Sequence, residues 1–340
     1  MVYVIFPLMV AIVAAFSLLP FNNTVIPEAG LLVYPFVLIV FPVLDLMVRK
    51  LNTAQNQLKT QLVHQIALAM VLPLMIILLI ASLVQINTYS LSMVDTITIG
   101  MAVGMYSGAI GMTAAHELIH RLNPSWRALG IGILLLVQYG HFRIEHIYGH
   151  HIHVATERDP ATARKGEGFY RFFVRCVLMS YLSAWRIERR RMNNRKRHTL
   201  NPSNRMLHYI IVQIACLAAG YGLAGVAGVV FLISQAVVAI ILTEAVDYIQ
   251  HYGLLRTTND AGKASPIQPE HSWNSRHAVG DWTTFNIGLH SHHHISGATP
   301  YPELSQDAEH HEMPGNYAVM ILMALMPPLW FRIMDKRLVA

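Results

Sequence analysis

The chain has 340 residues, of which 54% are hydrophobic and only 13% are charged, with a formal net charge of +6. Soluble domains carry about 25% charged residues, so the composition excludes an ordinary soluble protein and favours a membrane protein. The two cysteines, Cys176 and Cys216, exclude both a disulfide framework and a cysteine-based metal site.

Six apolar segments are long enough to serve as membrane spans, which need about 20 mostly apolar residues. The first segment is too long and too apolar for the core of a signal peptide, and no charged stretch precedes it. The last two are short and are joined tightly around Gly220–Gly225. The sequence therefore predicts an all-α, six-span transmembrane helical bundle, with spans at residues 2–20, 30–48, 64–86, 96–115, 207–223 and 226–246.

Two further apolar segments are poor candidates for a full crossing. Residues 128–140 are too few, and we expect them to form an interfacial or re-entrant helix. Residues 317–332 contain the pair Pro327 and Pro328, which argues against a straight helix through the bilayer.

Lys and Arg are distributed unevenly among the connecting segments. Loops 21–29 and 87–95 contain neither, whereas loop 49–62 and the segment 116–206 carry many. Because cytoplasmic loops are enriched in Lys and Arg, we expect both termini to lie in the cytoplasm, at the inner membrane of a bacterium. The four expected regions are spans one to four at 1–115, a cytoplasmic histidine-rich segment at 116–206, spans five and six at 207–246, and a cytoplasmic C-terminal segment at 247–340.

A run of basic residues at 186–197 has two interpretations. It could anchor the protein against anionic lipid, or it could form a docking surface for an acidic protein. Nucleic-acid binding is not expected in a chain that consists mostly of membrane spans.

Histidines cluster with a spacing that suits metal ligation. On a helix, residues four apart lie on the same face, so His116 and His120 can be directed at one point. By the same rule His146 and His150 are expected to be directed at another point, with His151 beside them. A single buried histidine is usually a hydrogen-bonded core residue, but repeated clusters predict metal ligands, and imidazole suits iron, zinc and copper.

The number of clustered histidines indicates two metal ions. A catalytic zinc takes three protein ligands, so nine imidazoles are too many for one such ion and give four to five ligands to each of two. The candidate ligands are His116, His120, His146, His150, His151, His251, His290, His293 and His294.

Several carboxylates lie near these histidines in sequence and are candidates to hold the ligand imidazoles by hydrogen bonds. Asp159, in the ERDP sequence, has an equally good interpretation as a turn-forming Asp-Pro. The candidates are Glu117, Glu145, Asp159, Glu244 and Asp247.

Small and flexible residues in the fourth span permit two interpretations. Gly104, Met105, Gly108 and Met112 could line a channel for a lipophilic substrate. Small residues also allow close packing between membrane helices, and the sequence alone leaves both readings open.

Other protein classes account less well for the histidines. HELIH at 116–120 matches the zinc-protease helix, with Glu117 as general base, but the surplus of histidines argues against one zinc. A metal transporter would place ligands at the bilayer midplane and carry inverted repeats, and the sequence shows neither. Two redox-capable ions beside a membrane suggest oxygen chemistry on a lipophilic substrate.

The spaced motifs together resemble the integral-membrane alkane monooxygenase and xylene monooxygenase family. They are HELIH (116–120), GHFRIEHIYGHH (140–151), ATERDPATAR (155–164), DYIQHYGLLR (247–256), HSWNS (271–275) and HSHHH (290–294). The resemblance implies a six-span hydroxylase in which the nine histidines hold two iron ions. Such an enzyme inserts one atom of O2 into a terminal or benzylic C–H bond. Electrons come from a rubredoxin or a ferredoxin-type protein with its NAD(P)H reductase.

The motifs do not separate the branches of that family. Gln250 and the sequence ISGATPYPEL (295–304) resemble the xylene branch, whereas GHFRIEH and HSWNS resemble the alkane branch. Alkanes and alkyl-aromatics are therefore both candidate substrates. A lipid desaturase, which uses similar histidine clusters, is a further alternative.

Overall fold

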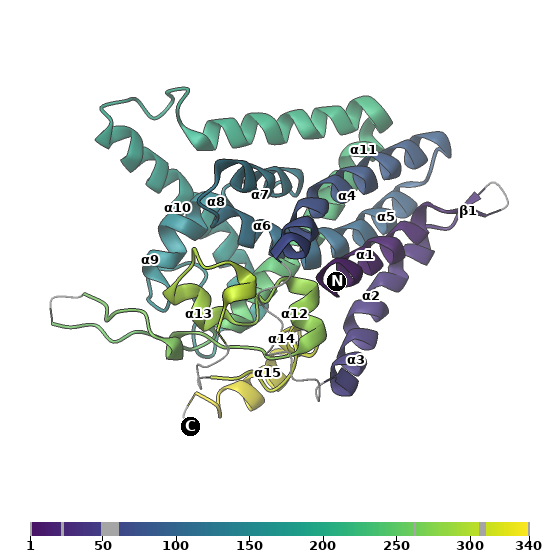
Figure 1. Ribbon diagram of the computed structural model, residues 1–340. Coiled ribbons are helices and arrows are strands. Elements are labelled where there is room, and N and C mark those ends of the chain that lie inside the picture. Colours follow the sequence, from purple (N-terminus) through teal and green to yellow (C-terminus); the bar gives the residue numbers. More distant parts are fainter. Residues whose placement is uncertain (1, 22–23, 49–60, 261–262, 306–310, 339–340) are drawn as a thin grey trace.

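The computed structural model describes residues 2–21, 24–48, 61–260, 263–305 and 311–338. Its helices form a bundle toward one side, and shorter helices and loops form the other side (Figure 1). The N-terminal elements are α1 (Val2–Ala15), β1 (Pro20–Phe21), β2 (Thr24–Val25), α2 (Val33–Pro35), α3 (Phe41–Val48), α4 (Gln61–Thr88), α5 (Met93–Tyr106) and α6 (Thr113–Ile119). The middle elements are α7 (Pro124–Leu136), α8 (Phe142–Glu145), α9 (His151–His153), α10 (Phe169–Asn194) and α11 (Arg205–His251). The C-terminal elements are α12 (Ala278–Thr284), α13 (His290–Ile295), α14 (Tyr317–Ala324) and α15 (Pro327–Met334).

Short 3-10 and π-helical turns connect or interrupt these helices. The 3-10 turns are η1 (Phe16–Leu18), η2 (Pro27–Leu32), η6 (Pro269–His271) and η7 (Tyr301–Glu303). The π-helical turns are η3 (Phe36–Val40), η4 (Ser107–Met112) and η5 (His146–His150). The antiparallel pair β1–β2, in register Pro20↔Val25, joins the first helix to the next and lies at the far end of the bundle in Figure 1.

Four helical segments among the described residues are long and apolar enough to cross a membrane: Pro27–Val48, Leu62–Thr88, Met93–Ile119 and Arg205–His251. They agree with predicted spans two, three and four and with the joined pair of spans five and six. The first predicted span corresponds to the shorter apolar helix Val2–Leu18, so a count of six crossings stays a prediction. The protein is thus an integral membrane protein with a mainly helical fold.

The long helix α11 doubles back on itself, as the sequence predicted for Gly220–Gly225. Ala224 and Gly225 have non-helical dihedral angles, with a positive φ of 59° at Gly225. In a continuous helix Gly220 and Leu232 would be about 18 Å apart, yet a Cβ placed on Gly220 would lie 2.5 Å from Leu232 Cδ1. The two halves of α11 therefore contact each other next to the break and run in different directions away from it (Figure 1).

The two remaining apolar segments form a short helix and a bent pair of helices, and their expected placement relative to the membrane stays a prediction. α7 has 13 residues, which is too short for a crossing. α14 and α15 are bent by 120° relative to each other at the break before Pro327 and Pro328. The bend brings the end of the chain back beneath the bundle (Figure 1).

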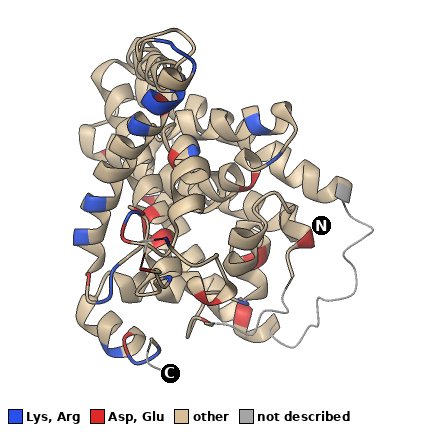
Figure 2. Ribbon diagram, turned by 90° about the vertical axis from the view of Figure 1, so that its left-hand side faces the viewer, with Lys and Arg blue, Asp and Glu red and all other residues tan. Residues whose placement is uncertain are grey.

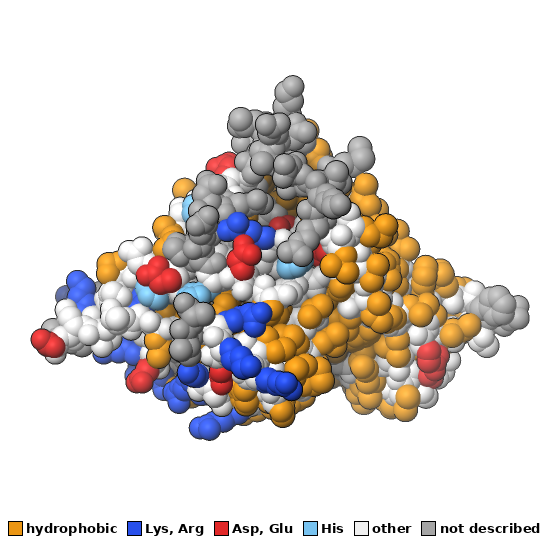
Figure 3. Space-filling view, turned by 90° about the horizontal axis from the view of Figure 1, so that it is seen from below, with side chains coloured by type: hydrophobic (Ala, Val, Ile, Leu, Met, Phe, Trp, Pro, Cys, Tyr) orange, Lys and Arg blue, Asp and Glu red, His pale blue; other side chains and the backbone are white. Residues whose placement is uncertain are grey.

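The surface is divided into an apolar and a charged part. Seen from below, hydrophobic side chains gather over the right-hand side and Lys and Arg over the left (Figure 3). Large apolar side chains are exposed on the bundle; Ile77 is 61% exposed and Val94 is 73% exposed. Such a continuous apolar exterior is stable against lipid rather than water.

Helices α5 and α11 pack closely through small residues. A Cβ placed on Gly104 would lie 2.7 Å from Val238 Cβ and 2.9 Å from the Gln235 carbonyl oxygen. Gly104 was predicted as a channel residue. Its position shows instead that it allows α5 and α11 to pack closely together. Its neighbour Gly108 contacts Leu242 in the same way.

A buried carboxylate joins α10 to the start of α11. Glu188 is fully buried and accepts hydrogen bonds from Arg205 Nε (2.8 Å), the Arg205 backbone N–H (2.9 Å) and an Arg191 N–H (2.8 Å). Burial by itself would raise the pKa of Glu188, but the hydrogen bonds and charge of Arg205 outweigh it and lower that pKa. Glu188 is therefore ionised at neutral pH and fixes the packing of α10 on α11.

We predict that Glu188→Ala lowers the free energy of unfolding by about 2–4 kcal/mol, less than for a fully buried pair because the two arginines are partly exposed. The measurement is the thermal unfolding midpoint in detergent, with the exposed Glu270→Ala as control. Because the pKa is lower in the folded state, the stabilisation is present above the unfolded pKa of about 4.3 and is lost as the pH falls through the folded pKa. An unchanged midpoint at pH 7 would contradict the role of this ion pair.

Candidate metal centre

The nine candidate ligands come from five parts of the chain that meet at the polar end of the bundle. His116 lies in α6 and His120 directly follows it; His146 and His150 lie in η5 and His151 starts α9. His251 ends α11, and α13 carries the last three, at positions 290, 293 and 294. The structure thus brings together all nine histidines that the sequence singled out.

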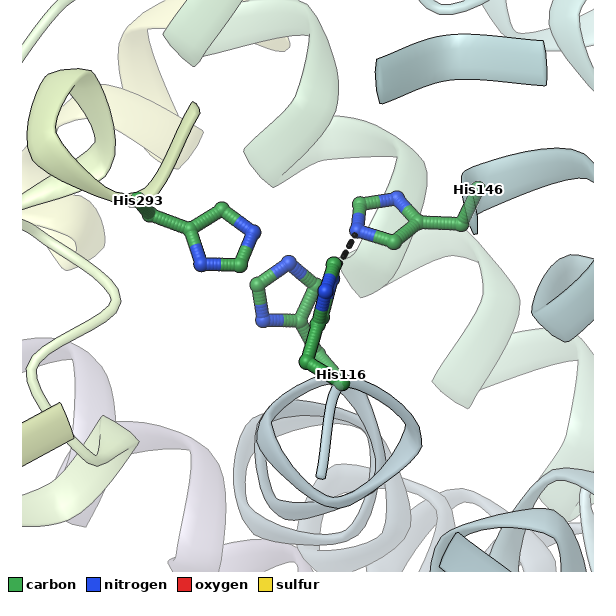
Figure 4. A group of neighbouring side chains, drawn as sticks. His116, His146 and His293 are labelled. Atoms are coloured by element: carbon green, nitrogen blue, oxygen red, sulfur yellow. Dashed lines mark hydrogen bonds between the residues drawn. The ribbon is translucent and has the colours of Figure 1, made fainter. Parts of the chain in front are cut away.

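The first histidine group comprises His116, His120, His146 and His293. One ring nitrogen of each lies within 4.8 Å of the corresponding nitrogens of the others. His146 Nε2 is 3.0 Å from His120 Nε2, and the labelled rings of His116, His146 and His293 converge on one point (Figure 4). The four side chains are directed inward from three different elements, as ligands of one ion would be.

The second histidine group comprises His150, His251, His290 and His294, all of which are buried. The distances between Nε2 atoms are 3.0 Å for His290 and His251, 2.9 Å for His294 and His290, and 3.3 Å for His150 and His294. This group therefore has the same geometry as the first.

The ninth histidine, His151, lies between the two groups. Its Nε2 is 3.1 Å from both His146 Nε2 and His293 Nε2. Its ring centroid is 4.6 Å from that of His294 in the second group. His151 thus adds a fifth imidazole to the first group and brings the two groups into contact.

The expected pairing of His146 with His150 is wrong. The two rings stack with centroids 5.2 Å apart, but their Nε2 atoms belong to different groups. The cause is the π-helical turn η5, in which the hydrogen-bond repeat is five residues rather than four. The partner of His146 is therefore His151, five residues on, and His150 is left to join the second group.

The geometry of both groups fits a metal ion. For a nitrogen–metal bond of about 2.0–2.1 Å, neighbouring ligand nitrogens lie about 2.9–3.4 Å apart, between right-angled and tetrahedral geometry. The observed Nε2 separations of 2.9–3.3 Å fall in this range. His116 Nε2 is buried and has no hydrogen-bond partner among the described residues. Lone pairs that face one another in a dry interior need a cation to satisfy them.

The electrostatic surroundings keep these imidazoles available as ligands. Burial lowers the pKa of His146 well below its usual value, and the neighbouring histidines His116 and His151 lower it further. The same causes, burial first, lower the pKa of His293 and His294. The rings are therefore neutral at pH 7, which is the form that binds metal.

Among the five predicted carboxylates, Asp159 contacts a histidine of the groups directly. His150 Nδ1 lies 2.9 Å from Asp159 Oδ2, and the Thr162 hydroxyl donates to the same oxygen at 2.6 Å. This arrangement directs His150 Nε2 into the second group and favours the hydrogen-bond role over a turn alone.

The other four carboxylates have different surroundings. Glu117 pairs with Arg121 at 2.6 Å and accepts the Tyr301 N–H at 3.2 Å. Glu244 accepts the Tyr139 hydroxyl at 2.8 Å. Glu145 is buried, and its Oε1 has no hydrogen-bond partner in the described part of the chain. Asp247 borders a cavity. No hydrogen bond between these four and the nine histidines occurs among the described residues, so their support of the ligands stays a prediction.

An apolar cavity of about 100 Å³ leads to the first histidine group. His116 forms part of its wall, together with residues from η3, α3, η4, α11, α12 and α14. Met105, Gly108 and Met112, predicted as channel residues, also line it, whereas Gly104 does not. The sequence did not single out Val37, Phe41 or Tyr317 in this wall, because nothing in an apolar stretch tells a cavity-lining residue from a lipid-facing one.

Comparisons with known proteins agree with this architecture. A family model described as fatty acid desaturase matches residues 95–323. Alkane 1-monooxygenase 1 of Pseudomonas aeruginosa is 36% identical over 238 residues, 70% of this chain and 62% of that protein. Alkane 1-monooxygenase 2 of Alcanivorax borkumensis is 30% identical over 337 residues, 95% of this chain and 88% of that protein.

The similarity extends to the xylene branch and does not cover every relative fully. The xylene/toluene monooxygenase hydroxylase component XylM of Pseudomonas putida is 29% identical over 238 residues, 69% of this chain and 62% of that protein. The chain likewise spans only 62% and 63% of the length of the two Pseudomonas aeruginosa alkane 1-monooxygenases.

With one metal ion expected in each histidine group, we predict that His251→Ala lowers the metal content by about one ion per chain, because it removes one of the four histidines of the second group while leaving the first intact. Metal content is measured on purified protein by mass spectrometry. The exposed His198→Ala is the control and is expected to keep the wild-type content. Equal metal content in wild type and His251→Ala, with both eluting as folded protein, would contradict the assignment.

Proposed function

Since the chain belongs to the fatty acid desaturase family, and by identities of 30–37% to the alkane monooxygenase family, we propose that it hydroxylates the terminal methyl group of an alkane with O2. The predicted resemblance is thereby confirmed at the level of the family. The observation that carries the proposal is the contact between an apolar cavity and a histidine group, since His116 belongs to both.

The proposed metals are two iron ions, one in each histidine group, with His151 completing the first. The support is the kind of ligand atom that the two groups offer. Nine neutral imidazole nitrogens with few carboxylates suit a redox-active transition metal, whereas Mg²⁺ and Ca²⁺ prefer oxygen ligands. When bound, the iron ions supply the activation of O2. The protein supplies the ligands, their orientation and a dry environment.

The cavity binds and orients the substrate. Its wall is mostly apolar, so an alkyl chain gains free energy by leaving water, about 0.8 kcal/mol for each buried CH2 group. Met112 and Thr113, about one helical turn before His116, line the cavity, as does Phe142, whose ring stacks on that of His146 with centroids 4.8 Å apart. A chain that fills the cavity therefore presents its terminal carbon to the first group.

The substrate enters from the lipid. Val37 and Leu38 in η3 and Ile321 in α14 line the cavity, and Ile39 next to them is 60% exposed on the apolar exterior. An alkane dissolved in the bilayer core can reach the cavity between these elements without crossing water.

The reaction requires electrons from outside the protein. Hydroxylation converts R–H, O2, two electrons and two protons into R–OH and water, and the cavity holds no source of electrons. We propose a rubredoxin or a ferredoxin-type protein with its NAD(P)H reductase as the donor, in line with the family resemblance.

The proposed topology has six crossings in a bacterial inner membrane, with both termini and the histidine groups in the cytoplasm. The support is the placement of loops: β1–β2 and the turn between α4 and α5, which lack Lys and Arg, lie at one end of the bundle, opposite α9, α10 and α13 (Figure 1). The proposed regions are 1–115, 116–206, 207–246 and 247–340.

A second candidate function is hydroxylation of a benzylic methyl group. It is favoured by Gln250, a xylene-type residue that lines the cavity and donates to the Tyr317 hydroxyl at 2.6 Å. An intramembrane zinc protease is less well supported, because Glu117, its general base, is held by Arg121 instead.

The decisive experiment offers octane and p-xylene to the protein in nanodiscs with rubredoxin, its reductase, NADH and O2. Two irons per chain and 1-octanol as product are the expected result, since a straight chain fits the apolar cavity. A benzylic alcohol alone would favour the second function, and an alkene would indicate desaturation. One zinc per chain and no O2 consumption would overturn the proposal.

We predict that Ala109→Phe shortens the cavity and lowers octane hydroxylation by about tenfold or more, with a smaller loss for pentane, because Ala109 lines the wall near Met112. Product formation is measured by gas chromatography. Ile97→Phe, at a site 41% exposed on α5, adds the same side chain outside the cavity and is the control. Equal losses for both alkanes would contradict a length-selecting role.

A further inference from the structure

An open groove of about 680 Å³ lies on the polar end of the molecule, close to the histidine groups. One wall comes from residues 152–158, which begin in α9, and the other comes from residues 255–258 and 263–264, which lie beyond the end of α11. Figure 2 looks onto this end of the molecule. The apolar cavity lies elsewhere, and the two share no lining residue.

The groove is lined by exposed apolar side chains and by basic ones. Ile152 and Leu255 are 55% and 53% exposed. Arg158, Arg256 and Lys263 are the basic lining residues and are called the rim below. Glu157 is the one acidic side chain among the groove-lining residues, so the rim carries a net positive charge.

The two walls are held together by hydrogen bonds. The Arg256 guanidinium donates to the Ile152 carbonyl at 2.9 Å and to the Ser265 carbonyl at 3.1 Å. The Arg256 backbone N–H donates to the Ala155 carbonyl at 2.7 Å. A pre-formed surface of this kind loses little conformational entropy when a partner binds.

The groove is joined to both histidine groups through a short piece of backbone. Ile152 directly follows His151 of the first group and is two residues from His150 of the second. The Val154 N–H donates to the His150 carbonyl at 2.6 Å, which folds the wall back onto the second group. A protein seated in the groove is therefore separated from the histidines by little more than this turn.

We propose that the groove is the docking site of the electron donor, a small iron–sulfur or rubredoxin-type protein with an acidic surface. This inference rests on the proposed function, which requires an external electron source. Charge complementarity selects an acidic partner and steers its approach, and the exposed Ile152 and Leu255 offer apolar area that a partner can bury. Each reduced carrier is oxidised by one electron in the groove, so two dockings supply the two electrons of one turnover.

The test measures binding rather than turnover, with a rubredoxin of net negative charge as the probe and the metal-loaded protein in nanodiscs. Arg158→Glu with Lys263→Glu reverses two rim charges on exposed side chains. The matched control is Arg171→Glu with Lys336→Glu, which makes the same change in net charge at exposed positions outside the groove lining. The Kd is determined at 50 and 300 mM NaCl.

We expect the groove variant to raise the Kd by about tenfold or more at low salt, and the control to change it less than about threefold, because close charges act within a Debye length. Ile152→Ser with Leu255→Ser is expected to raise the Kd at both salt concentrations. The proposal is overturned if the groove and control variants bind alike, if rubredoxin does not bind, or if a basic cytochrome c binds more tightly.

This outcome is separable from that of the proposed function. If octane is hydroxylated and the groove variant still binds rubredoxin like the wild type, the assignment of the docking site to the groove is wrong and the proposed function stands. If rubredoxin binds the groove but neither octane nor p-xylene is converted, the docking surface stands and the substrate assignment is wrong.

Discussion

The crowding of nine imidazoles, seven of them buried and His120 and His151 half-buried, into one small volume is the constraint on which the rest of the structure depends. Ring nitrogens about 3 Å apart, enclosed by apolar helices, cannot all be satisfied by sharing protons, since a proton on one ring repels the next. A cation in each of the two groups would resolve this conflict. The elements that carry the rings must then be held in fixed positions, which explains the hydrogen bonds of Asp159 with His150 and Thr162.

The three π-helical turns of the described chain all border the cavity or the histidine groups. η3 contributes Val37 and Leu38 to the cavity wall, η4 contributes Gly108 and Met112, and η5 carries His146 and His150. A π-turn inserts one residue into a helix and changes the faces that follow it. Two of these turns therefore set which side chains face the cavity, and the third divides neighbouring histidines between two groups.

Much of the fold follows from local sequence, because apolar length, glycine and proline act locally. The break at Ala224–Gly225 and the bend before Pro327 are of this kind. The separation of His146 from His150 could not be predicted, because the four-residue rule presumes an α-helix. The role of Gly104 could not be predicted either. A glycine that lines a substrate channel and a glycine that packs against a neighbouring helix cannot be told apart from the sequence alone.

The arrangement also separates the routes of the two reactants in the proposed reaction. The cavity reaches the first group from the apolar side, through His116 on α6, while the groove meets the turn after His151 on the polar side. A lipophilic substrate and a water-soluble electron donor can thus bind at the same time without competing for space. Because His151 contacts rings of both groups, the backbone that the donor would approach is continuous with the ligands of both ions. The same short segment, residues 146–153, therefore couples the membrane side of the site to its aqueous side.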